Sequence, residues 1–187
     1  MVSAIVLGLV LLVAVAWLLV QFTLVLRPAV SEAMGYLHVL TVAPDGALVA
    51  ELPVGAVAVA VVLALFIHEF VHGLLFWWFT GRRPVFGFQG LLIYAAAPPG
   101  ICLPRDRYLI AGLAPLVLLT LVGLLLMLIV LITFVPILSF FLVFNTAGAG
   151  GDLVMVAKLL SYSPDNLLQD RDTGVVVYGP GEHRGVI

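Results

Sequence analysis

The sequence is poor in charged residues: Asp, Glu, Lys and Arg make up 10% of its 187 residues, whereas 64% are hydrophobic. A soluble domain carries about 25% charged and about 45–50% apolar residues, so this composition excludes an ordinary water-soluble protein. Disorder is excluded as well, because a disordered chain combines low hydrophobicity with a high net charge. The mean hydropathy of +1.26 instead indicates an integral membrane protein with several spans.

An excess of basic residues is also missing, since the formal net charge is −2. Without a basic face to neutralise phosphates, a nucleic-acid partner is excluded. Cys102 is the one cysteine in the chain. It therefore has no partner for an internal disulfide, and zinc-finger or CxxC motifs, which need more than one cysteine, are excluded too.

Four apolar runs are long enough to cross a bilayer, which takes about 20 residues of helix. The first run lacks basic residues at its start and is too long for a signal peptide, so we expect a retained helix rather than a cleaved signal. The predicted fold is an all-α membrane protein, a single integral membrane domain over residues 1–187. Its predicted parts are spans at 2–26, 54–79, 108–133 and 134–160 and a tail at 161–187.

Positive charges fall unevenly on the two sides of this predicted bundle. With four spans, the amino terminus, the 80–107 loop and the tail share one side, and the other side holds only Arg27. The positive-inside rule then places both termini and the 80–107 loop in the cytoplasm. The 27–53 loop faces outward, and the chain is a multi-pass protein in contact with the lipid bilayer.

Two segments outside the spans have strand-like patterns. Residues 85–94 are aromatic and β-branched, are punctuated by glycine and precede Pro98 and Pro99, so they predict a β-hairpin near the membrane surface. The alternative is an ordinary loop lying on the bilayer. In the tail, a turn at 170–174 precedes a predicted short strand at 175–178, which either pairs with the loop or frays.

Ionisable side chains are rare within the predicted spans, where such groups cost about 2.5–3.5 kcal/mol each and mark functional sites by default. Three of them, His68, Glu69 and His72, form the pattern His-Glu-x-x-His. On a helix, residues four apart share a face, so both imidazoles can reach one zinc ion. The glutamate can then act as general base toward the water on that zinc. The alternative is a pair of buried histidines hydrogen-bonded to nearby carbonyls.

A catalytic zinc site needs a third protein ligand and leaves its fourth position to water. Asp152 is the other carboxylate within a span, and counted from the starts of their spans it lies at nearly the depth of the two histidines. The alternative for Asp152 is a helix cap or an interfacial carboxylate. His38 and His183 are poorer ligand candidates, because both lie outside the spans.

Polar and small residues precede Asp152 in the fourth run. Asn145 lies seven residues earlier, hence on the same face, where it could donate a hydrogen bond to a substrate carbonyl or oxyanion. An interhelical hydrogen bond is the alternative. The small residues at 147–151 permit local unwinding or close packing, and we expect them to contact the second span.

With HEFVHG at 68–73 in one helix and NTAGAGGD at 145–152 in another, the chain resembles site-2-protease-like intramembrane zinc metalloproteases. It resembles more closely a zincin peptidase family of small bacterial and archaeal membrane proteins of unknown function. This resemblance covers residues 54–178 and includes RPVFG at 83–87 and QDRDTGVVVY at 169–178.

The resemblance implies a peptidase of a prokaryotic cell membrane, with His68, His72 and Asp152 as zinc ligands and Glu69 as catalytic base. Site-2 proteases carry Asn-x-x-Pro and a later Leu-Asp-Gly. This chain departs from both patterns, because Ala and Gly stand in the proline region and Leu153 follows the aspartate.

We therefore predict an intramembrane metallopeptidase that hydrolyses a peptide bond of a membrane-embedded or membrane-associated protein. Its cofactor is Zn²⁺, held by His68, His72 and Asp152, and its catalytic residues are Glu69 and Asn145. The alternative is a non-proteolytic membrane metal-binding protein, such as a metal carrier or assembly factor, which does not need Glu69 as a base. A third alternative, a structural scaffold with incidental histidines, predicts no bound metal.

Overall fold

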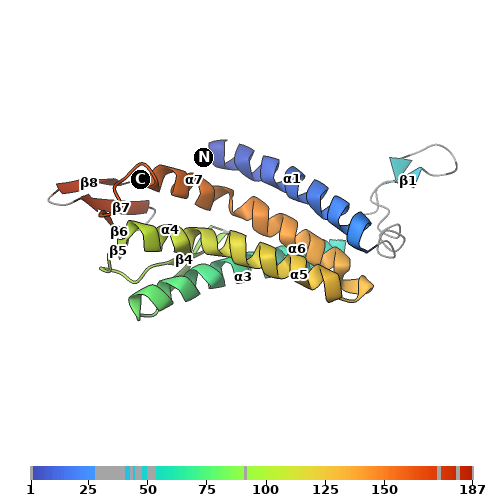
Figure 1. Ribbon diagram of the computed structural model, residues 1–187, viewed down its shortest axis with the longest axis horizontal. Helices are drawn as coiled ribbons and strands as arrows, with labels where there is room; N and C mark the ends of the chain where they lie inside the picture. Colours follow the sequence, from blue (N-terminus) through green and yellow to red (C-terminus); the bar gives the residue numbers. More distant parts are fainter. Residues whose placement is uncertain are drawn as a thin grey trace.

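Helices dominate the computed structural model of the protein (Figure 1). It describes residues 2–27, 41–42, 44, 48–49, 54–90, 92–171, 174–179 and 182–186; His38 and most of the 27–53 loop lie outside this part. Two of the described helices are long and continuous: α1 (Val2–Leu26) and α3 (Val54–Thr80). The helical segments that follow are interrupted by short turns of another helix type, and each run of helical segments is called a rod.

Proline or glycine accompanies each interruption: Pro115 in the first rod, and Gly148 and Gly150 on either side of Ala149 in the second. In the first, α4 (Arg105–Ala114) passes into a π-helical turn, η1 (Pro115–Leu119), and then into α5 (Thr120–Ile129). In the second, a 3₁₀ turn, η2 (Ile132–Phe134), leads into α6 (Val135–Gly148) and α7 (Gly150–Leu159). The break at Ala149 falls within the predicted interruption at 145–152, and Pro136 lies in the first turn of α6, as predicted.

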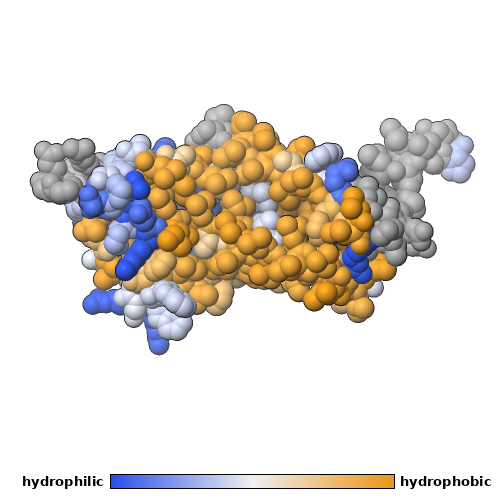
Figure 2. Space-filling view, in the orientation of Figure 1, coloured by the Kyte–Doolittle hydropathy of each residue, from blue (hydrophilic) through white to orange (hydrophobic). Residues whose placement is uncertain are grey.

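Three rods are long and apolar enough to cross a membrane: Val54–Thr80, Arg105–Ile129 and Ile132–Leu159. The apolar stretch Ile5–Leu19 of α1 is shorter. Figure 2 shows hydrophobic side chains covering the middle of the molecule, with hydrophilic residues gathered toward both ends. These features are those of a membrane protein.

The Arg105–Ile129 rod ends before the boundary at 133 that was predicted for this span. Val130 adopts an extended conformation there. The Arg27 guanidinium donates hydrogen bonds of 2.9 Å each to the carbonyls of Met127 and Val130. Since the last carbonyls of a helix lack partners within it, this arginine supplies a donor to two of the carbonyls at the α5 terminus.

The β-hairpin predicted at 85–94 is present and slightly longer. It consists of β3 (Val85–Gln89) and β4 (Leu92–Ala96), which pair antiparallel with Phe86 opposite Ala95. The hairpin packs along α3 at Gly73, where a Cβ atom would lie only 2.3 Å from Cζ of the Phe86 ring. Glycine at this helix position is what allows the Phe86 ring to lie so close to α3.

The all-α prediction is too narrow, because a four-stranded antiparallel sheet lies at one end of the bundle (Figure 1). The predicted tail strand is β7, and it pairs with β6 and β8 rather than with the hairpin. β5 lies just before α4 and pairs with β6, so the segment before α4 and the tail meet at this end. The strands are β5 (Leu103–Pro104), β6 (Leu167–Arg171), β7 (Gly174–Gly179) and β8 (Glu182–Val186), and a separate two-stranded sheet joins β1 (Thr41–Val42) to β2 (Leu48–Val49).

Two apolar clusters form the core. The Leu142 cluster joins α1, α3, α5 and α6, and the Leu168 cluster joins α3, α4 and α7 to the four-stranded sheet. The sheet forms because its buried residues complete the second cluster. The buried members of the Leu142 cluster are Leu19, Ala60, Ala64, Met127, Val135, Phe141 and Leu142. Those of the Leu168 cluster are Phe76, Ala97, Leu103, Tyr108, Leu109, Ala111, Leu159, Leu168, Val175 and Val177.

The prediction that the small residues at 147–151 contact the second span is wrong for both Gly148 and Gly151. A Cβ atom at either position would meet nothing within 4 Å. The close approach is instead made by α1, since a Cβ atom at Gly8 would lie 3.0 Å from the carbonyl oxygen of Ala147. Gly148 and Gly151 line cavities, and their lack of side chains leaves that space open.

Candidate metal centre

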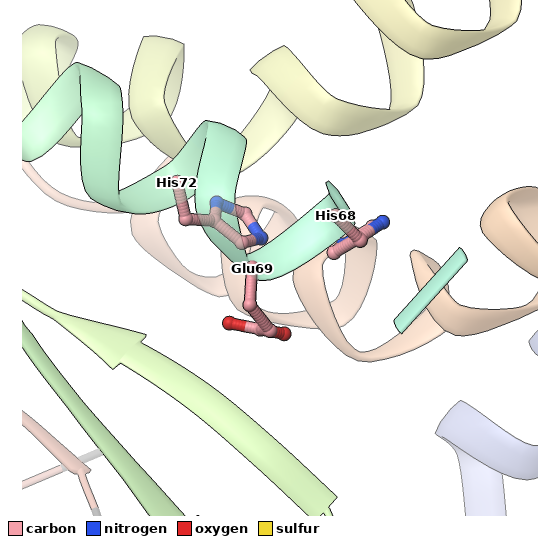
Figure 3. Close-up of side chains that lie close together, drawn as sticks. All are labelled: His68, Glu69 and His72. Atoms are coloured by element: carbon pink, nitrogen blue, oxygen red, sulfur yellow. The ribbon is translucent and has the colours of Figure 1, made fainter. Parts of the chain in front are cut away.

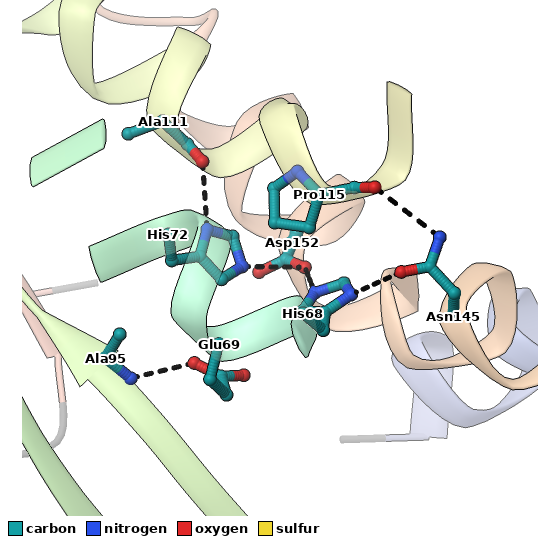
Figure 4. Close-up of polar contacts among 8 residues, drawn as sticks. All are labelled: His68, Glu69, His72, Ala95, Ala111, Pro115, Asn145 and Asp152. Atoms are coloured by element: carbon teal, nitrogen blue, oxygen red, sulfur yellow. Dashed lines mark hydrogen bonds and ion pairs between the residues drawn. The ribbon is translucent and has the colours of Figure 1, made fainter. Parts of the chain in front are cut away.

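The two histidines of the His-Glu-x-x-His pattern lie one turn apart on α3 and are both buried (Figure 3). Their ring centroids are 4.9 Å apart, with the rings nearly perpendicular. Glu69 is less buried and its carboxylate lies between α3 and β4 (Figure 4). The helical period therefore puts both imidazoles on one face of α3, as predicted from the spacing.

A backbone carbonyl orients the His72 ring. Nδ1 of His72 lies 2.9 Å from the carbonyl oxygen of Ala111 on α4. A carbonyl oxygen only accepts hydrogen bonds, so Nδ1 carries the hydrogen and donates it. In the neutral imidazole, Nε2 then presents a lone pair, which is the form that binds a metal.

An amide orients the His68 ring. Nδ1 of His68 lies 2.9 Å from Oδ1 of Asn145 on α6, and Nδ2 of Asn145 lies 3.5 Å from the carbonyl oxygen of Pro115. Because the Pro115 carbonyl only accepts, the amide nitrogen faces it and the amide oxygen faces the ring. His68 therefore also donates from Nδ1 and presents the Nε2 lone pair.

Asp152 of α7 brings a carboxylate to both rings (Figure 4). Its Oδ2 lies 3.0 Å from Nε2 of His68 and 3.5 Å from Nε2 of His72. Two lone pairs and an anionic oxygen repel one another unless a cation lies among them. Ligand atoms bound at about 2.0–2.1 Å to a tetrahedral zinc ion lie about 3.3 Å apart, close to both measured distances. This donor set fits zinc.

Glu69 is held by the neighbouring hairpin. Its Oε2 accepts a hydrogen bond of 2.7 Å from the backbone N–H of Ala95 on β4. Ligand atoms of Glu69 and the two histidines also lie within 4.8 Å of one another. By distance alone, Glu69 and Asp152 are therefore both candidates for the third ligand, with Asp152 in closer contact with the histidines.

Two cavities meet at the carboxylates of Glu69 and Asp152, which line both. One, of about 240 Å³, extends past His72 toward Tyr108. The other, of about 310 Å³, extends past His68 toward Gly148 and includes Asn145. Since open space lies on both sides of the two carboxylates, a chain segment in contact with them could continue in either direction.

The similarity to known proteins agrees with this geometry. Residues 61–167 match a family described as "Putative zincin peptidase". The chain belongs to this family. The match contains all five residues singled out in the sequence: His68, Glu69, His72, Asn145 and Asp152. No curated protein and no solved structure matches the chain.

Membership of the zincin peptidase family indicates a metallopeptidase with zinc as its metal, as predicted from the motif. Some contacts of this zincin's site were not predicted from the sequence. The carbonyl of Ala111 has no side-chain signature, and its role depends on how α4 packs against α3. Only the proline four residues later gives a signal that this carbonyl lacks its usual helical partner.

Asp170 of β6 was also not predicted to lie near the site. Its carboxylate accepts the hydroxyl hydrogen of Tyr108 and a 2.6 Å hydrogen bond from the N–H of Ala97. Burial raises the pKa of the Asp170 carboxyl above its ordinary value, although both hydrogen bonds act to lower it. This contact joins the tail sheet to α4 and to the end of the hairpin, beside the 240 Å³ cavity that Tyr108 lines.

Proposed function

We propose that this membrane zincin is an intramembrane zinc metallopeptidase that hydrolyses a peptide bond of a membrane-embedded or membrane-associated protein. The observation that carries the proposal is the convergence of two Nε2 atoms and the Asp152 carboxylate beside Glu69, within rods long enough to span a membrane. Buried ionisable groups are costly in such rods, so their retention here supports a functional role.

In this proposal His68, His72 and Asp152 hold the metal. Asp152 is preferred to Glu69 as the third ligand, because its oxygen lies closer to both rings and Glu69 is bound to the Ala95 N–H. When bound, zinc supplies Lewis acidity toward the peptide carbonyl and makes a water molecule acidic enough to lose a proton near neutral pH.

Glu69 then acts as the proton carrier. It accepts a proton from the attacking water and returns it to the amide nitrogen as the carbon–nitrogen bond breaks, while the water oxygen stays in the new carboxyl group. The Ala95 N–H keeps the Glu69 carboxylate aligned between the two cavities. Asn145 lines the 310 Å³ cavity, where donation to a substrate carbonyl stays a prediction.

The edge of β4 that faces away from β3, and that pairs with no other strand in the described residues, is the proposed substrate-binding element. One edge of β4 pairs with β3, while the N–H groups of Ala95 and Ala97 point to the side chains of Glu69 and Asp170. An extended peptide can add to this edge as a further strand, through backbone groups of β4 other than these two N–H groups. A substrate helix has to unwind first, because a helical peptide carbonyl is already hydrogen-bonded.

We further propose, from the distribution of arginines, that both termini face the cytoplasm of a prokaryotic cell. Single cysteines in place of Glu51 and Arg184, in a background where the exposed Cys102 is replaced by serine, test this with a membrane-impermeant thiol reagent. If the chain has four spans, the reagent added outside should label the cysteine at position 51 and should not label the cysteine at position 184. Labelling of both positions from the same side would contradict the four-span topology.

The catalytic role of Glu69 separates a peptidase from a metal carrier. Wild-type protein purified in detergent without chelators should contain about one zinc per chain. Reconstituted with bacterial membrane proteins, it should generate new protein N-termini that mass spectrometry detects. Glu69→Gln should keep the zinc and lose the cleavages, because an amide does not accept the proton.

Each alternative has its own result in the same experiment. A carrier or assembly factor would bind zinc without generating new N-termini. Cleavage that persists in Glu69→Gln would remove Glu69 from the mechanism. Wild-type protein without any transition metal would contradict the zinc site itself.

A further inference from the structure

Pro115 stands where the α4–α5 rod needs a hydrogen-bond donor. In a regular α-helix the carbonyl of Ala111 receives the N–H of residue 115, but proline has no N–H. The rod does not end at this position; it passes through the π-helical turn η1 and continues as α5. Ala111 is fully buried, so water does not replace the missing donor.

The carbonyl that lacks this α-helical donor is the one that binds His72. The 2.9 Å contact from Nδ1 of His72 supplies the donor that residue 115 withholds. A buried carbonyl without any partner is costly, so the missing helical hydrogen bond favours this ring orientation over others. Proline at 115 thereby selects the tautomer that presents Nε2 toward Asp152.

The same proline residue also acts on the other ring. Its own carbonyl oxygen lies 3.5 Å from Nδ2 of Asn145, which turns the amide oxygen toward Nδ1 of His68. Figure 4 shows the two chains of contacts, one from Ala111 to His72 and the other from Pro115 through Asn145 to His68. Both histidines are thus oriented by one interruption in a helix that contributes no ligand.

We propose that Pro115 is a positioning residue of the metal centre: by withholding an N–H from Ala111 and offering its carbonyl to Asn145, it fixes both histidines with Nε2 available to the metal. π-Helical turns often occur at functional sites, and here the turn begins at this proline. The inference rests on the proposed metal site, but not on peptidase activity. Outer partners of metal ligands typically change metal affinity by about 10–100-fold.

The test compares two replacements of Pro115 that differ only in the hydrogen-bond donor. Pro115→Ala introduces an N–H. Lactic acid at the same position, incorporated by nonsense suppression, has the same methyl side chain but an ester oxygen in place of the N–H. Zinc affinity is measured in detergent by competition with a chromophoric chelator, and the thermal midpoint is measured on zinc-free protein.

We expect about a tenfold loss of zinc affinity in Pro115→Ala, with affinity within about threefold of wild type in the lactic acid variant. The thermal unfolding midpoint of zinc-free Pro115→Ala should equal or exceed that of wild type, because the new N–H can donate the helical hydrogen bond to the Ala111 carbonyl. A merely structural proline would instead give equal losses of affinity in both variants. Pro136→Ala is the control, because Pro136 lies in the first turn of α6, where no helical donor is missing.

The outcomes separate this inference from the proposed function. Wild-type binding of zinc with unchanged affinity in Pro115→Ala would overturn the role of Pro115 and leave the metal site in place. Equal losses in the alanine and lactic acid variants would overturn it too. Wild-type protein that binds no zinc would overturn both.

Discussion

The Leu142 cluster and the Leu168 cluster are both apolar, but they join different kinds of element. The Leu142 cluster packs helix against helix, as in α5 against α6. The Leu168 cluster packs the ends of α3 and α4 against a four-stranded sheet whose residues come from the tail and from the segment before α4. The metal centre lies along α3 between Ala64 of the first cluster and Phe76 of the second.

The difference shows which part of the fold serves the chemistry. Packing of helix against helix brings the Asn145 amide of α6 to His68 and the Ala111 carbonyl of α4 to His72, and these groups orient the two histidines. The polar contacts to Glu69 and Tyr108 come from β4 and β6, on the side where the second cluster holds strands against helices. Changes on the two sides should therefore have separable effects on stability, zinc binding and cleavage.

The largest effect is expected where the two sides meet. Asp152→Ala removes the oxygen on which both Nε2 atoms converge, so zinc affinity should fall by more than about 100-fold, beyond what an outer partner costs. Chelator competition measures this loss, and Asp165→Ala, exposed after α7, is the control. Unchanged zinc affinity in Asp152→Ala would contradict Asp152 as the third metal ligand and favour Glu69 in that role.

A methyl group at Gly73 should act on the hairpin side alone. The Cβ of Gly73→Ala would lie 2.3 Å from the Phe86 ring, so the ring has to move. We expect the movement to displace the hairpin and to strain the contact between Ala95 and Glu69. Cleavage should fall by about 10–100-fold, as for misplacement of a reacting group by about 1 Å. Zinc affinity should stay at the wild-type value, and a parallel loss of zinc would show that the hairpin supports the ligands as well.

The matching change in the Leu142 cluster should affect stability alone. A Cβ at Gly123 would lie 2.3 Å from Cδ2 and 3.0 Å from Cγ of Leu142, so Gly123→Val overpacks α5 against α6. Overpacking of this kind costs about 1–3 kcal/mol in the free energy of unfolding. Thermal melting in detergent measures it against Gly55→Val, where a Cβ meets nothing within 4 Å. Loss of zinc from the folded Gly123→Val protein would contradict the separation.

The smallest effect is a pH dependence on the sheet side. Burial raises the pKa of Asp170 in the folded protein above its ordinary value of 3.8. A raised pKa means that the folded state binds the proton more tightly, so the stability from this group is full below the ordinary value and is lost as pH rises through the raised one. Thermal midpoints of Asp170→Asn should lack this decline. An identical pH profile in wild type and variant would exclude Asp170 as its source.

Features that depend on neighbouring residues were predictable. The hairpin at 85–94, the strand at 175–178 and the interruption at 145–152 follow from alternation, turn residues and glycine, and the structure confirms all three. The four-stranded sheet was not predicted, because β5 is only two residues long and pairs with a strand more than sixty positions later. Periodicity over a short window carries no signal of such a pair.

The metal centre likewise combines a feature that the sequence predicts with one that only the tertiary structure decides. Spacing along one helix is enough to place His68 and His72 on a common face of α3, since the helical period is local and does not depend on the rest of the fold. Which nitrogen of each ring faces the metal depends on partners 39 and 77 positions away, the Ala111 carbonyl and the Asn145 amide. Those partners come within hydrogen-bonding distance only when α4 and α6 pack against α3, because hydrogen bonds act over about 3 Å and distance along the chain does not constrain them.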